Sequence, residues 1–107
     1  MMKGFEDRNG FEPAFQRDQG LAFRIIARRN RLFGLWAAER LGLPAGEAAE
    51  DYAIAVAAAD FEMPGDDDVV SKVRSDLAEK GITLTEAELR AELSRAAAEA
   101  RRQLSQS

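Results

Sequence analysis

The residues best placed to do chemistry are three arginines in the first half of the chain, Arg24, Arg28 and Arg31. Their spacing puts them on one face of a helix, with Arg17 about two turns earlier. Such a cationic stripe can bind an acidic protein, a phosphate group or a membrane surface. It can also be a solvated helix face that pairs with acidic residues of the same protein, and the spacing alone favours this plainer interpretation.

A second candidate is the acidic segment from Asp60 to Ser71, whose carboxylates partly follow the spacing of a calcium-binding loop. Two positions of that loop fail, because Pro64 replaces an oxygen ligand and Ser71 replaces the bidentate glutamate that closes such a site. Asp66, Asp67 and Asp68 are better explained as the N-cap and first turn of a helix. We therefore predict no metal site.

Catalytic groups are scarce. The sequence has no cysteine and no histidine, which removes thiolate nucleophiles and the commonest general base and metal ligand. It also lacks a glycine-rich phosphate loop and a nucleophile paired with a base. We predict a protein that is not an enzyme and needs no cofactor. Trp36 and Tyr52 are interpreted as core residues rather than as a recognition pair.

Composition indicates one helical domain. The 107 residues are rich in alanine, leucine, glutamate and arginine, which favour helices. With no membrane-spanning run or secretory signal, a cytoplasmic protein without direct membrane insertion is expected. The net charge of -4 weighs against a nucleic-acid partner. The charge is uneven, because residues 44–94 hold thirteen acidic against four basic side chains and residues 1–43 hold eight basic against five acidic.

Apolar residues recur at helical spacing in four segments, which predicts an all-α fold: a four-helix bundle-like body with a flexible N-terminal arm. The first helix is expected over residues 18–41, with Gly42 as its stop, and the second over residues 46–61. The third begins at the aspartates and ends before Gly81, and the fourth begins at a capping box formed by Thr85 and Glu88. Alanines at positions 49, 53 and 57 are expected to leave room for the close approach of a neighbouring helix. The predicted core residues are Ile25, Ile26, Leu32, Phe33, Trp36, Ala37, Tyr52, Val56, Ala59, Val69, Val70, Val73, Leu77, Leu89, Leu93, Ala96, Ala97, Ala100 and Leu104.

Residues 1–17 break this pattern. Interior glycines cost a helix about 1 kcal/mol each and an interior proline about 3 kcal/mol, so an isolated arm should not be stably helical. Phenylalanines at positions 5, 11 and 15 are typical anchors of a segment that folds when it binds. We therefore divide the chain into a mobile arm, residues 1–17, and a four-helix domain, residues 18–107.

A dense set of residues around the tryptophan carries a family resemblance. It comprises Ala27–Leu32, Gly34–Glu39, Leu41–Leu43, Tyr52, Ala53, Val56, Ala59–Glu62, Gly65, Asp66, Asp68, Val69, Lys72, Val73, Asp76, Leu77 and Gly81. In these residues the chain resembles the alphaproteobacterial ATPase inhibitor zeta subunit family. The resemblance extends from about Phe5 to about Leu93.

This resemblance implies an inhibitor of ATP hydrolysis by the F-type ATP synthase. The arm would insert between the catalytic alpha and beta subunits beside the rotor, become helical and block rotation in the hydrolytic direction. The expected partner is thus the catalytic head of the enzyme, and the free protein is expected to be a monomer. The expected partner-binding residues are Phe5, Asp7, Arg8, Phe11, Phe15, Arg17 and Asp18 in the arm, with Arg24, Arg28 and Arg31 as supporting contacts.

The arm departs from its family at Gly10, Pro13 and Gly20, where relatives usually have helix formers. We expect a weaker inhibitor than typical relatives, or one whose inhibitory helix begins at Pro13. Two alternatives remain open: a binding module that uses the Arg24/Arg28/Arg31 face, and a peripheral membrane protein that uses its first helix.

Overall fold

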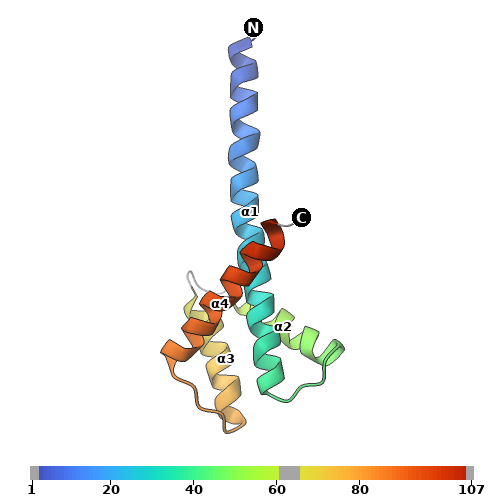
Figure 1. Ribbon diagram of the computed structural model, residues 1–107, viewed down its shortest axis with the longest axis vertical. Coiled ribbons are helices and arrows are strands. Elements are labelled where there is room, and N and C mark those ends of the chain that lie inside the picture. Colours follow the sequence, from blue (N-terminus) through green and yellow to red (C-terminus); the bar gives the residue numbers. More distant parts are fainter. Residues whose placement is uncertain (1–2, 61–65, 106–107) are drawn as a thin grey trace.

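The computed structural model describes the backbone of residues 3–60 and 66–105, and the side chains from residue 20 onward within those ranges. It contains four helices: α1 (Lys3–Arg40), α2 (Glu47–Ala59), α3 (Asp67–Glu79) and α4 (Glu86–Ser105). No strand occurs in the described ranges. Figure 1 shows a four-helix body from which the N-terminal part of α1 projects as an arm. The predicted all-α architecture is confirmed.

The first helix begins earlier than predicted. Helix α1 extends back to Lys3, so its backbone is helical through Gly10, Pro13 and Gly20. The prediction considered the arm by itself, where a helix must first be nucleated. In the structure the arm continues a helix that packing in the body already holds, and adding residues to an existing helix avoids the nucleation cost. The predicted start at residue 18 was therefore wrong.

Two glycines end helices as predicted. Gly42 and Gly81 have φ angles of 82° and 80°, a conformation that favours glycine. After α3, the Ile82 amide donates to the Leu77 carbonyl at 2.9 Å and the Gly81 amide to the Ala78 carbonyl at 2.9 Å. This is a Schellman motif, and the equivalent bonds surround Gly42. Local backbone chemistry thus fixes where α1 and α3 stop.

The capping box at the start of α4 is also confirmed. The Thr85 amide donates to Glu88 Oε1 at 2.8 Å, and the Glu88 amide donates to Thr85 Oγ1 at 3.1 Å. Two amides that have no partner inside the helix are satisfied in this way.

The core lies where one face of α1 meets the other three helices. Phe33 is fully buried and stacks on the half-buried Trp36, with ring centroids 5.7 Å apart. Ile26 was predicted to be in this core, but it is 42% exposed. The neighbouring Ile25 and Arg28 face α4 at this level of α1, which leaves Ile26 exposed, so the prediction for Ile26 was wrong. The predicted core residues that are buried are Phe33, Ala37, Val56, Val69, Val70, Val73, Leu77, Leu89, Leu93, Ala96 and Ala100.

Helices α1 and α2 approach closely at Gly34. A Cβ atom added to Gly34 would lie 2.7 Å from the Cα atom of Ala53, which is too close for any side chain. Ala53 and Ala49 are themselves buried. As the alanine pattern predicted, small residues allow two helix backbones to pack tightly, and this contact holds α1 against the body.

Candidate protein-binding surface

The three arginines predicted as a stripe lie together on α1. Arg24, Arg28 and Arg31 line a surface pocket of about 280 Å³ together with Ala27 and Leu104. Leu104 belongs to the last turn of α4, whose C-terminal end lies beside α1 in Figure 1. The helical spacing brings the arginines together, and α4 supplies the opposite side of the pocket.

These arginines differ in their partners. Arg31 Nη2 lies 2.7 Å from Glu50 Oε2, an exposed ion pair with the acidic middle of the chain. Arg28 Nη1 donates to the side-chain oxygen of Gln103 at 2.7 Å, and an amide does not neutralise its charge. Arg24 is exposed and has no ion-pair partner among the described residues. The pairing with the acidic middle of the chain is thus seen at Arg31, whereas Arg24 is exposed to solvent.

The predicted contacts of the arm fall in the projecting part of α1. The structure gives the backbone of this part as helix. The side chains of Phe5, Asp7, Arg8, Phe11, Phe15, Arg17 and Asp18 lie outside the described residues. Their role in binding stays a prediction.

The sequence did not predict a polar cluster centred on Asn30. Although it is polar, this side chain is only 2% exposed, because it lies on the same buried face of α1 as Phe33 and Ala37. Its Nδ2 donates to Asp60 Oδ2 at 3.0 Å, and its Oδ1 accepts from Arg29 Nη2 at 2.7 Å. A buried amide is stable only when its hydrogen bonds are made. The sequence offered one sign of this cluster, an asparagine at a helical position whose neighbours on the same helix face are apolar. It could not identify the partner, because Asp60 is distant in the chain.

Arg29 extends this cluster to the beginning of α3. Its Nη2 lies 3.0 Å from Asp66 Oδ1, and the Arg29 side chain is only 11% exposed. Asp66 occupies the N-cap position of α3, as predicted, but its side chain makes no capping hydrogen bond. The cap prediction was wrong in this respect, because the carboxylate turns to the arginine instead.

The metal prediction can be compared only in part. No group of three metal-ligating side chains occurs within residues 20–60 and 66–105. Glu62, Pro64 and Gly65 of the calcium-loop pattern lie outside the described residues. Among the described aspartates of the pattern, Asp60 and Asp66 are bound by Asn30 and Arg29, whereas the buried Oδ2 atom of Asp68 has no hydrogen-bond partner within the described ranges.

Tyr52 joins α2 to α3. Its hydroxyl donates to Asp76 Oδ2 at 2.7 Å, and Lys72 Nζ lies 3.1 Å from the same oxygen. The ammonium group is also 5.4 Å from the centre of the tyrosine ring. Burial and the bond to Asp76 raise the pKa of the Tyr52 hydroxyl far above its ordinary value. The group therefore stays a neutral donor, which suits a structural role.

The fold and these contacts define a class: an all-helical protein whose polar clusters join helices and whose first helix projects from the body. The family model of ATPase inhibitor subunit zeta matches residues 2–103. The chain therefore belongs to the ATPase inhibitor subunit zeta family.

The chain is also similar to a solved structure. The chain is 46% identical to a protein solved by solution NMR, over 78% of this chain and 94% of that one, with a TM-score of 0.69. No curated protein matches the chain. None of the helices in the described part of the chain is long and apolar enough to cross a membrane.

Proposed function

We propose that the protein inhibits ATP hydrolysis by the F-type ATP synthase through its N-terminal arm, residues 1–17. The arm would insert at the interface of the alpha, beta and rotor subunits and block hydrolytic rotation. The observation that carries this proposal is the projecting part of α1, which stands clear of the other three helices in Figure 1, in a member of an ATPase inhibitor family.

The dimensions of α1 suit an inserted arm. At about 1.5 Å per residue, the stretch from Lys3 to Gly20 is about 25 Å long. An arm of this length can enter a cleft between subunits while the body stays outside. The anchor predictions, Phe5, Phe11 and Phe15, supply apolar area for such a contact, and the charged residues Asp7, Arg8, Arg17 and Asp18 supply polar contacts.

An arm that blocks a rotor must also be held firmly by the body. Phe33 and Ala37 bury the continuing part of α1, and Gly34 packs directly against Ala53. Asn30 and Arg29 add hydrogen bonds to Asp60 and Asp66. Because α1 is one helix, a force on the arm passes directly into this packed region.

This function requires no catalytic group or cofactor in the inhibitor. Without histidine, the protein cannot use imidazole titration to switch its activity near neutral pH. Regulation would come instead from the state of the enzyme, from the concentration of the inhibitor or from the order of the arm. We place the protein in the bacterial cytoplasm, at the soluble head of the membrane-bound synthase, and as a monomer when free.

The test is ATP hydrolysis by the purified cognate head. The full chain should inhibit, and a variant lacking residues 1–17 should not. Far-UV circular dichroism and a melting curve check that the truncated chain keeps its fold. A full-length Phe11→Ala/Phe15→Ala variant tests the same point without truncation. Unchanged hydrolysis in excess of the full chain, or full inhibition by the truncated chain, would overturn the proposal.

A further inference from the structure

A groove lies where α1 passes the C-terminal end of α4, and the residues that line it come after the arm in α1 and from α4. We call it the junction groove, with an apolar floor of Leu21, Ile25 and Leu104 and a basic rim of Arg24, Arg28 and Arg101. We propose that the junction groove docks an acidic amphipathic helix of the ATPase head. The identity of the partner rests on the proposed function.

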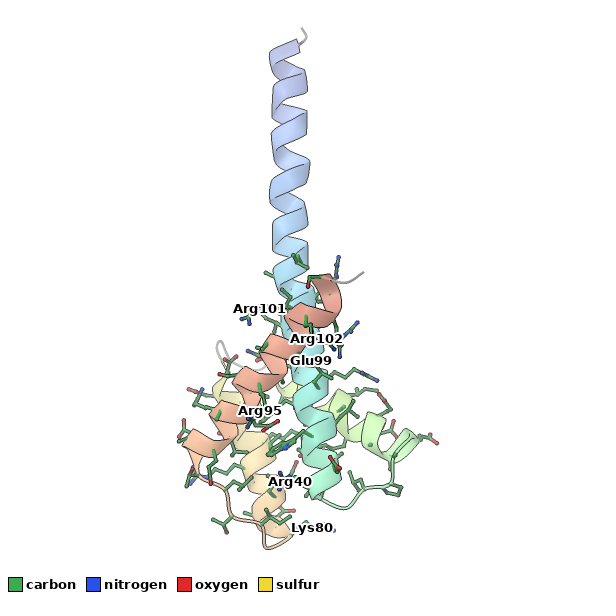
Figure 2. All side chains as sticks on the ribbon, in the orientation of Figure 1. Arg40, Lys80, Arg95, Glu99, Arg101 and Arg102 are labelled. Atoms are coloured by element: carbon green, nitrogen blue, oxygen red, sulfur yellow. The ribbon has the colours of Figure 1, made fainter. Side chains whose placement is uncertain are left out.

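Two adjoining pockets make up this groove. One of about 280 Å³ is lined by Arg24 and Arg28, and the other, of about 270 Å³, by Leu21, Ile25 and Arg101. Both pockets include Leu104, so they lie next to each other. Figure 2 shows Arg101 on the upper part of α4, where that helix lies beside α1.

Within the described residues, the groove carries positive charge that no carboxylate compensates. None of the described side chains that line either pocket is a carboxylate. Arg24 and Arg101 form no ion pair among the described residues, and Arg28 bonds only to the neutral Gln103. The nearby Glu99 accepts a hydrogen bond from Arg102, which lowers the pKa of Glu99 to about 2. The negative charge of Glu99 is therefore paired with Arg102, which does not line the groove.

An acidic amphipathic helix fits both features of the groove. Its apolar side chains would fill the two pockets, and its carboxylates would meet the three arginines. A lipid surface fits less well, because membrane-binding helices present a protruding apolar face rather than a concave one.

The junction groove lies close to the arm, so docking there would affect how the arm binds. Leu21 and Arg24 lie just after the projecting part of α1. If the body were bound to the head at this point, the arm would stay close to the cleft of the head into which it inserts. Linking two contacts in this way raises the effective concentration of the second one. Docking would therefore help an arm that contains Gly10 and Pro13.

The test compares two full-length variants with equal changes in net charge. Arg24→Glu/Arg101→Glu reverses the rim of the groove. Arg74→Glu/Lys80→Glu reverses two exposed basic residues of the α3 region, and Lys80 lies at the opposite end of the body in Figure 2. Circular dichroism checks that both variants fold. Binding to the immobilised purified head gives Kd, and ATP hydrolysis is measured separately.

We expect the groove variant to bind about tenfold or more weakly, and the control within about twofold of the parent. The difference should shrink as salt is raised, because exposed charges are screened. In a second comparison, Leu21→Ser should weaken binding, whereas Ile54→Ser, an exposed isoleucine on α2 that is 65% accessible, should not.

The outcomes separate this inference from the proposed function. If the parent inhibits and the groove variant keeps the parent's Kd, the junction groove is not a docking site, while the proposed function stands. If the parent binds without inhibiting and the groove variant binds weakly, the groove stands and the inhibitory function fails. Absence of any binding overturns both. Loss of self-association, or of binding to anionic vesicles, in the groove variant alone would assign the groove to a second copy or to lipid, and would also overturn the inference.

Discussion

Asn30 Nδ2 donates a hydrogen bond of 3.0 Å to Asp60 Oδ2, and this bond joins the middle of α1 to the end of α2. Arg29, the preceding residue, reaches Asp66 at the beginning of α3. Two consecutive residues of α1 therefore bind both sides of the connection between α2 and α3. The polar cluster therefore adds directional hydrogen bonds to the apolar packing that holds α1 against the body.

Replacing Asn30 should destabilise the fold. Asn30→Ala leaves the carboxylate of Asp60 and the guanidinium of Arg29 without their bonds to the amide, at a cost of about 1–3 kcal/mol. Urea unfolding, followed by the fluorescence of the single tryptophan, measures this change. Arg31→Ala is the control, because its exposed pair with Glu50 should contribute about 1 kcal/mol or less. Equal stability of the two variants would contradict the role given to Asn30.

Two glycines of α1 should respond in opposite directions to the same substitution. Gly34→Ala forces a Cβ atom against the backbone of Ala53, and overpacking of this kind costs about 1–3 kcal/mol. At Gly20 an added Cβ atom would meet nothing within 4 Å, so Gly20→Ala should stabilise the helix by about 0.5–1 kcal/mol. Thermal melts of both variants check the signs, and a stabilised Gly34→Ala protein would show that the helices can separate freely.

Tyr52 should titrate only at very alkaline pH. Burial and the bond to Asp76 raise its pKa in the folded protein above the ordinary value of 10.0. The folded state therefore favours the neutral hydroxyl, and the resulting stability is fully present below pH 10 and is lost as pH rises through the folded pKa. Because Tyr52 is the only tyrosine, absorbance near 295 nm reports its ionisation alone.

Two variants test the cause of this shift. Asp76→Asn removes the negative charge and should lower the alkaline midpoint of Tyr52 towards its ordinary value. Tyr52→Phe should abolish the absorbance change and leave the spectrum flat across the same range. A normal tyrosine titration in the folded parent would contradict the contact between Tyr52 and Asp76.

Helix breakers in the arm should limit inhibition. A Gly10→Ala/Pro13→Ala/Gly20→Ala variant removes several kcal/mol of helix-propensity cost, which ordering of the arm otherwise subtracts from binding. It should inhibit the cognate ATPase at a lower concentration than the parent. The midpoint of inhibition measures this change, with circular dichroism to follow helix content. An unchanged midpoint would mean that these residues do not limit the arm.

The sequence predicted most of the fold because its signals are local. Gly42, Gly81 and the Thr85/Glu88 box each act within a few residues, so helix ends could be assigned without tertiary information. Asn30 could not be interpreted in this way, since its partner Asp60 is thirty residues further along the chain. Ile26 was misplaced because α4 covers the side of α1 that carries Ile25 and Arg28, and the apolar pattern of α1 alone could not show which side that is.

The candidate binding surface was predicted less completely. The spacing of the arginines identified Arg24, Arg28 and Arg31 but did not show that Glu50 neutralises one of them. It also could not show that Arg101 and Leu104 complete a groove, because they come from the other end of the chain. Such surfaces depend on how helices cross, and that information lies outside any single helix.

Because α1 is one continuous helix from Lys3 to Arg40, the direction of each arm residue about the helix axis is fixed relative to the buried residues of the body. Position 15 precedes the buried Phe33 by eighteen residues, which is about five turns of an α-helix, so both positions have the same angle about the axis. One residue inserted after Gly20 would rotate the arm by about 100° relative to the body without changing the composition of either. The direction in which the arm presents its residues is therefore encoded in the number of residues between arm and core.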